Sequence, residues 1–227
     1  MNEINAAPTK SFFVDMITRD IPLDRAILDL IDNSIDGAHR LRPDDDFEGL
    51  FVKLTIGKDH FHIADNCGGI PLDIAKHQAF RFGKTKDYDA PDHSIGRFGI
   101  GMKRALFKIG NNFTINSVHS ESNFSLSLNV PEWLKKAEWD FNFETKDEDA
   151  KNDISNWKTE ISVTNLHSHI SNEFKEKYFI TDVRKEVAFA HSLIIKKGFK
   201  IYINEELIIR KQFHIKFGDH LKPSIVN

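Results

Sequence analysis

The chain has 227 residues, of which 40% are hydrophobic and 29% are charged, and its formal net charge is −3. This length suits one large domain or one and a half. The small net charge excludes a global basic field that would attract nucleic acid, but it does not exclude a local basic patch. Cys67 is the only cysteine, which excludes an intrachain disulfide framework and indicates a reducing compartment.

The sequence carries neither a targeting signal nor a membrane segment. "MNEINAAPTKSFF" has no basic start followed by an apolar core, as a secretory signal requires. No apolar run approaches the roughly 18 residues of a membrane helix. We therefore expect a soluble, cytoplasmic protein without a membrane partner.

The first half of the chain predicts four helices and one pair of strands. Pro22 and Pro71 each open a helix, because proline suits the first turn, and Gly110 ends another as a C-cap. Alternating apolar and polar residues indicate the strands. In chain order we expect a helix over residues 11–18, a longer helix over 22–41 and two strands over 50–57 and 60–65. A helix over 71–80, an irregular loop over 81–98 and a helix over 99–110 follow.

The second half predicts mostly strands, followed by a long helix. We expect a hairpin over residues 112–120 and 123–130, followed by two further strands over 139–145 and 159–166. One helix over 172–197 comes next, and a final hairpin over 199–210 turns at "NEE". Helices and strands mix without regular βαβ alternation. The fold class is therefore α+β, and a sandwich is favoured over a doubly wound sheet.

"DLIDNSIDGAH", residues 29–39, places polar side chains at regular spacing on the second helix. Because a helix advances about 100° per residue, Asp29, Asn33, Asp36 and Arg40 share one stripe. Taken alone, this stripe is better explained as the solvated face of an amphipathic helix. The other motifs have to decide between that explanation and a binding site.

Glycines cluster in the next two motifs. Seven of the twelve glycines lie within residues 68–110. "SIGRFGIGMKRA" runs from a glycine-rich loop into a helix, where free N–H groups and the helix dipole favour phosphate. Lys103 and Arg104 add positive charge there. The order of residues is neither that of a Walker loop nor that of a dinucleotide fingerprint. "IADNCGGIP" places Asp65 at a strand end before two glycines, a pattern that an ordinary β-turn also explains.

These three motifs, in this order, resemble the GHKL ATPases over residues 22 to about 166. That superfamily includes the DNA gyrase ATPase subunit, MutL and MORC proteins, histidine kinases and the ninety-kilodalton chaperones. The resemblance implies a two-layer α/β sandwich, the Bergerat fold, with a mixed sheet covered on one face by helices. It also implies ATP and Mg²⁺ as ligands.

The resemblance assigns roles residue by residue. Asn33 would ligate Mg²⁺, Asp29 holds the position of the general base with Asp32 as a second candidate, and Asp65 would accept a hydrogen bond from the adenine amine. Residues 81–97 fall where the family carries its ATP lid. The residues implied at the nucleotide are Asn33, Asp36, Asp65, Gly69, Ile70, Lys84, Thr85, Lys86, Gly96, Arg97, Phe98, Gly99, Ile100, Gly101, Met102, Lys103 and Thr159.

Three positions depart from the family pattern. The base position holds Asp29, where hydrolysing members usually have glutamate, and the missing methylene withdraws the carboxylate by about 1.5 Å. Cys67 replaces a glycine and is expected to be a small packed side chain. Lys158 stands where glycine is common. These changes bear on the rate of hydrolysis more than on binding.

Three functions fit the motifs, and we favour Mg²⁺-dependent ATP binding with slow hydrolysis that drives a conformational and dimerisation switch. The alternatives are the phosphotransferase domain of a histidine kinase and a nucleotide-binding module that does not hydrolyse ATP. His39 is the first histidine, so no phosphoacceptor histidine precedes residue 22.

The expected organisation is an N-terminal arm with a short helix (1–21), the ATP-binding domain (22–166) and an exit toward a transducer domain (167–227). The ending "LKPSIVN" suggests an N-terminal fragment of a larger protein. A nucleotide-dependent homodimer is expected, with a DNA or protein client bound through further domains.

Overall fold

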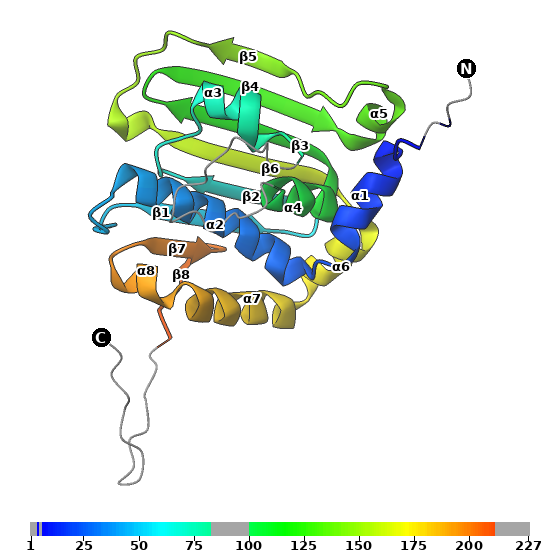
Figure 1. The fold of residues 1–227 in the computed structure, drawn as a ribbon. Coiled ribbons are helices and arrows are strands. Elements are labelled where there is room, and N and C mark those ends of the chain that lie inside the picture. The colour runs from blue at the N-terminus through cyan, green and yellow to red at the C-terminus, as the bar shows by residue number, and fades with distance from the viewer. Residues whose placement is uncertain (1–3, 5, 83–99, 212–227) are drawn as a thin grey trace, which may run out of the picture.

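The protein folds as a layer of helices against one eight-stranded sheet (Figure 1). The computed structural model describes residue 4 and residues 6–82 and 100–211. The strands are β1 (Phe51–Ile56), β2 (His60–Asp65), β3 (Gly110–His119), β4 (Ser122–Asn129), β5 (Phe143–Asp147), β6 (Lys158–Leu166), β7 (Lys200–Ile203) and β8 (Glu206–Leu207). The helices are α1 (Lys10–Arg19), α2 (Leu23–Leu41), α3 (Leu72–Ile74), the π-helix η1 (Ala75–Ala79), α4 (Gly101–Ile109), α5 (Val130–Lys135), the 3₁₀ helix η2 (Ile154–Asn156), α6 (Ser168–Lys175), α7 (Lys177–Ala190) and α8 (Ser192–Lys196).

The sheet is mixed, with the strand order β5-β4-β3-β6-β2-β1-β7-β8. β1 and β7 run parallel, and the other neighbouring pairs are antiparallel. Because side chains alternate between the two faces of a strand, Phe61, Ile63 and Asp65 of β2 point to the same face and are buried there. The apolar alternation of β2 therefore carries Asp65 under the helix layer.

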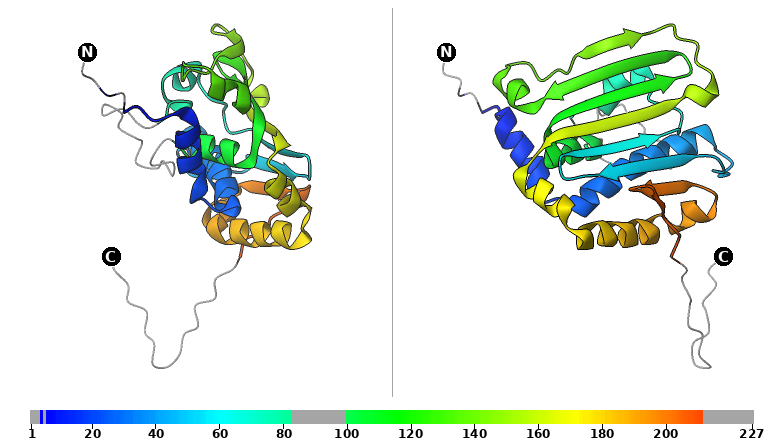
Figure 2. Two further views of the ribbon diagram at one scale, coloured as in Figure 1. Left: turned by 90° about the vertical axis from the view of Figure 1, so that its right-hand side faces the viewer. Right: turned by 180° about the vertical axis from the view of Figure 1, so that it is seen from behind.

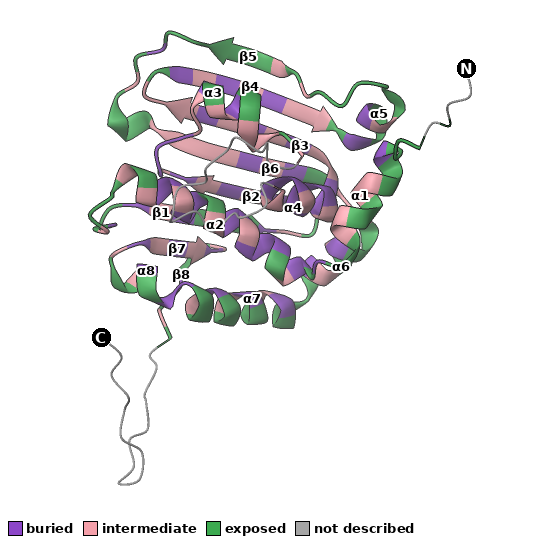
Figure 3. Ribbon diagram, viewed as in Figure 1, coloured by how far each residue is buried: buried purple, intermediate pink, exposed green. Residues whose placement is uncertain are grey.

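The helices cover one face of the sheet, as the side and rear views show (Figure 2). α2 and α4 lie over the central strands, and α7 and α8 run along the edge near β7 and β8. Buried positions lie where α2 and α4 face the strands, whereas the outer turns of α7 are exposed (Figure 3). Ile27, Leu30 and Ile31 of α2 are almost fully buried, and each contributes about 1.5–3 kcal/mol to folding. The predicted α+β sandwich is confirmed.

The long helix predicted over 172–197 is wrong, because the chain bends twice within it. Glu176 is extended, with φ −80° and ψ 120°, and His191 separates α7 from α8. Phe174 and Phe179 are both buried, with ring centroids 5.7 Å apart. Five residues of continuous helix would turn these two side chains about 140° apart. The bend at Glu176 lets both of them reach the core.

The region from residue 130 to residue 147 also differs from the prediction. α5 was not expected; the side chain of Asn129 caps it by accepting from the backbone N–H of Glu132, and proline occupies its first turn. β5 begins at residue 143 rather than 139. Trp139 and Phe141 instead pack against Trp133, with ring centroids 5.8 and 5.6 Å away. Aromatic packing thus keeps the first half of the predicted strand out of the sheet.

The N-terminal helix α1 is fixed to this aromatic region by one lysine. The Lys10 ammonium group is buried and donates to the carbonyl oxygens of Trp133 and Lys136, both at 2.9 Å, and to that of Glu138. It also lies 4.3 Å from the centre of the Trp133 ring. The Trp133 carbonyl also accepts from the Lys136 backbone N–H at the end of α5, and the other two carbonyl groups lie beyond that helix, so one side chain joins α1 to the end of α5. None of the helices in the described part of the chain is long and apolar enough to span a membrane.

Candidate nucleotide-binding site

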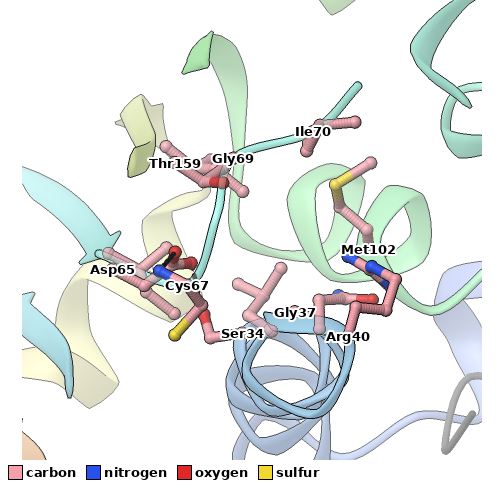
Figure 4. Close-up of a pocket in the computed structure, with 13 residues that line it drawn as sticks. Ser34, Gly37, Arg40, Asp65, Cys67, Gly69, Ile70, Met102 and Thr159 are labelled. Carbon is pink, nitrogen blue, oxygen red and sulfur yellow. Dashed lines mark hydrogen bonds between the residues drawn. The ribbon is translucent and has the colours of Figure 1, made fainter. Parts of the chain in front are cut away.

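A pocket opens between α2, the loop after β2, the start of α4 and strand β6 (Figure 4). α2 contributes one face of its helix, and β6 contributes the residue that pairs with Asp65 across the ladder, Thr159. The pocket is lined by Leu30, Asn33, Ser34, Gly37, Arg40, Ile63, Asp65, Cys67, Gly69, Ile70, Met102, Thr159 and Ile161.

Asp65 is the buried charged group of this pocket, with 8% of its surface exposed. Its Oδ2 accepts a hydrogen bond from the Ser34 hydroxyl at 2.7 Å, and its Oδ1 accepts from the Cys67 backbone N–H at 2.9 Å. Burial raises the pKa of the Asp65 carboxyl, and these two donors oppose the rise. The fold thus supplies neutral donors that fix both carboxylate oxygens in a site otherwise unfavourable to charge.

Two glycines allow the chain to approach closely around Asp65. Gly69 has φ +70°, and a Cβ atom there would lie 2.2 Å from the carbonyl oxygen of Val118. In α2, a Cβ on Gly37 would lie 2.8 Å from the carbonyl oxygen of Cys67. Neither position can accept a side chain without moving the backbone that forms the pocket.

The other end of the site contains Asp29 and Asn33. Asp29 Oδ2 accepts hydrogen bonds from Arg104 Nε at 2.8 Å and Nη2 at 2.6 Å. Burial raises the pKa of Asp29, and Arg104 opposes that rise. Asn33 donates from Nδ2 to the backbone carbonyl of Asp29 at 2.8 Å. Its amide therefore directs the nitrogen toward the helix and the oxygen, the atom that binds metal, in the other direction.

The arrangement fits a Mg²⁺ ion that arrives with its nucleotide. Among the described residues, no group of three His, Cys, Asp or Glu side chains could hold a metal ion. Mg²⁺ is usually bound by one or two protein oxygens, several waters and the phosphates of the substrate. The Asn33 oxygen is of the kind that Mg²⁺ accepts, and the remaining ligands would come from phosphate and water.

Lys103 lies elsewhere than predicted. We expected it at the phosphates, but its side chain is 2% exposed and Nζ donates to the carbonyl oxygen of Ala79 at 2.6 Å. Burial lowers the pKa of Lys103 to about 8. Position 103 lies on the side of α4 that faces the core, so its ammonium group ties α4 to the end of η1. Arg104, the other cation expected at the phosphates, pairs with Asp29.

The structure brings part of the predicted site together. Asn33, Asp65, Gly69, Ile70, Met102 and Thr159 line the pocket. Ile100 and Gly101 begin α4, and a Cβ on Gly101 would lie 3.4 Å from Asp29 Oδ2. Lys84, Thr85, Lys86, Gly96, Arg97, Phe98 and Gly99 lie outside the described residues.

Three predicted acids, Asp29, Asp32 and Asp36, do not line the pocket. Asp32 Oδ1 lies 2.8 Å from Nε2 of His191, a buried residue at the α7–α8 junction. Asp36 is on α2 and half-buried. Sequence reasoning in turn missed Ser34 and Gly37. Their spacing from Leu30, four and seven residues along the helix, is the signal that could have placed all three on the face toward the sheet.

An α+β sandwich with a buried aspartate beneath its second helix, and a glycine-rich sequence that precedes α4, is typical of an ATP-binding module of the GHKL type. Residues 21–164 match the family described as "Histidine kinase-, DNA gyrase B-, and HSP90-like ATPase". The match covers more than half of the chain, and the chain belongs to this family. No curated protein matches the chain.

Proposed function

We propose that the protein binds Mg²⁺-ATP, hydrolyses it slowly and uses the cycle to drive a conformational and dimerisation switch. The observation that supports this best is the Asp65 carboxylate, which is buried in the pocket and fixed by neutral donors. A carboxylate only accepts hydrogen bonds, so it suits the donor amine of adenine and opposes the carbonyl that guanine carries at the same position. Thr159, paired with Asp65 in the ladder, would support the base from the β6 side.

With adenine at Asp65, the phosphates would extend along α2 toward Asn33 and the start of α4. The first N–H groups of a helix have no intrahelical partner, so those of α4 would be donors for the phosphate oxygens. Asn33 would hold Mg²⁺, which neutralises phosphate charge when bound. Asp29 would orient the attacking water and accept its proton, with Asp32 as the second candidate.

Slow turnover follows from the short side chain of Asp29 and its ion pair with Arg104. Phosphoryl transfer depends on positioning and on cations that stabilise the charge on the γ-phosphate. Asp29 is one methylene shorter than glutamate and is paired with Arg104. The same pair favours a second candidate function, a module that binds ATP without hydrolysing it. Three further expectations stay predictions. They are the exit of residues 167–227 toward a transducer domain, the binding of a DNA or protein client, and a cytoplasmic location.

Calorimetry with ATP and GTP, a phosphate-release assay and sedimentation with a non-hydrolysable ATP analogue test the proposal. We expect binding of ATP but not GTP, turnover far below about 1 s⁻¹, and a monomer that dimerises with the analogue. Equal binding of GTP would overturn the role of Asp65. Turnover near 1 s⁻¹ from a monomer would show that the site is complete without a partner.

A further inference from the structure

Arg104 binds the carboxylate that we assign as the base. Both of its donors, Nε at 2.8 Å and Nη2 at 2.6 Å, reach the same oxygen, Asp29 Oδ2. The two side chains are 33% and 23% exposed, so water shields the pair only in part. Charge-assisted hydrogen bonds of this length are about twice as strong as neutral ones.

This contact reduces what Asp29 can do for a water molecule. Two donors on Oδ2 draw electron density from the carboxylate and leave Oδ1 as the oxygen that could accept a proton. The pair also holds the short Asp29 side chain against α4, where a Cβ on Gly101 would be 3.4 Å from Oδ2. Among the residues that the structure describes, the charged groups that act on Asp29 are Arg25 and Asp32 from α2 and Arg104 from α4. Of these three, Arg104 is the one that is hydrogen-bonded to Asp29.

We propose that Arg104 is a positioning residue that holds Asp29 against α4 and thereby restrains hydrolysis. This inference rests on the proposed function, in which Asp29 is the general base. In chemical terms, the Arg104–Asp29 ion pair competes with the attacking water for the Asp29 carboxylate. Weakening the pair should increase kcat and leave ATP affinity nearly unchanged, because Arg104 does not line the pocket.

Arg104→Met and Arg104→Gln test the restraint, and Arg104→Lys restores the charge. We expect kcat to rise roughly three- to tenfold in the Met and Gln variants, within the range that a general base controls, with KM within about twofold of the parent. Arg104→Lys should return kcat most of the way to the parent value. Assays at alkaline pH keep the carboxyl ionised in every variant.

Arg184→Met is the matched control. Arg184 pairs with Glu206 at 2.6 Å and is 25% exposed, but it lies on α7 away from the pocket. Its loss should leave kcat unchanged. A merely structural role for Arg104 would lower kcat or melting temperature and would not produce a gain that lysine reverses.

Combining Arg104→Met with Asp29→Asn separates this inference from the proposed function. The double variant should return to background, because the gain needs the carboxylate. If Asp29→Asn alone hydrolyses ATP like the parent, Asp29 is not the base and the proposed function fails. The restraint by Arg104 is wrong if Asp29→Asn is inactive and neither Arg104→Met nor Arg104→Gln is faster than the parent. The same holds if neither Arg104 variant shows measurable turnover.

Discussion

Helix α2 contributes to both ends of the site, and the two ends are built differently. At the end proposed to bind the base, Ser34 and the Cys67 backbone hydrogen-bond to Asp65, so neutral groups fix the carboxylate. At the end proposed for catalysis, Asp29 is held by the positive charge of Arg104. Neutral donors fix a carboxylate and leave its charge for a ligand, whereas a guanidinium group neutralises it. Under the proposed function, recognition of the base is therefore preorganised, while the carboxylate proposed as the general base is occupied by a partner from another helix.

The sharpest separation of the two ends comes from Asp29→Asn. This change keeps the shape of the side chain and removes its basicity, so hydrolysis should fall by about 10²–10⁴-fold, to background. ATP affinity should stay close to that of the parent. Single-turnover phosphate release and calorimetry measure the two quantities. Undiminished turnover in this variant, with loss in Asp32→Asn, would move the base to Asp32.

Outside the site, on the side of α4 that faces the core, the buried Lys103 should lower the stability of the fold. Its pKa is lowered to about 8 by burial, so between pH 8 and its ordinary value of 10.5 the unfolded chain binds more protons than the folded one. The free energy of unfolding therefore rises with pH across this window, by up to about 3 kcal/mol.

Lys103→Met should be more stable than the parent at pH 7.5, and its advantage should shrink by pH 9.5. The gain is smaller than the full pKa effect, because the hydrogen bond to Ala79 is lost, which costs about 1 kcal/mol. Chemical denaturation at both pH values measures this, with Lys108→Met on the same helix as the control. A difference that does not change with pH would contradict the prediction.

The base-binding end is tested by Asp65→Asn. Replacing a buried carboxylate that accepts from the adenine amine should weaken ATP binding at least tenfold, about 1.4 kcal/mol. Calorimetry with ATP and GTP gives the affinities, and Asp73→Asn, an exposed acid on α3, is the control. Unchanged ATP affinity would remove Asp65 from the site and with it the contrast between the two ends.

Asn33 lies at the same end of the site as Asp29, and its effect should be the smallest. Asn33→Ala should weaken ATP binding about fivefold, about 1 kcal/mol, in Mg²⁺ and hardly at all in excess EDTA. Asn33→Asp keeps an oxygen ligand and should retain the Mg²⁺ dependence. Equal losses with and without the metal would mean that Asn33 only supports the helix through its bond to Asp29.

Local pattern predicted much of this molecule. The proline at residue 22 and the apolar spacing of α2 place that helix, and the alternation in β2 places Asp65 under it, since both follow from periodicity. The turn at "NEE" also forms as predicted, with Asn204 and Glu205 at positive φ. These features depend on residues within one element, where propensity and period act together.

The features that were missed depend on contacts between distant elements. The bend at Glu176 exists because Phe174 and Phe179 both reach the core, and no local signal marks it. Lys103 and Arg104 are adjacent cations after a glycine-rich loop, and only the packing of α4 on α2 and η1 sends one to Ala79 and the other to Asp29. Side-chain partners across helices are tertiary information that periodicity does not carry.

The parallel pairing of β7 with β1 has a consequence for how the chain is made. Phe51 of β1 pairs with Lys200 of β7, so that contact closes a loop of roughly 150 residues, and such non-local pairing is slow. Ribosomes add about 5–20 residues per second, which leaves the edge of β1 unpaired for many seconds during synthesis. An open edge of this kind can pair with other chains. A chain cut near residue 164, where the family match ends, would keep that edge exposed, so we expect such a truncation to aggregate even though its nucleotide-binding motifs are present.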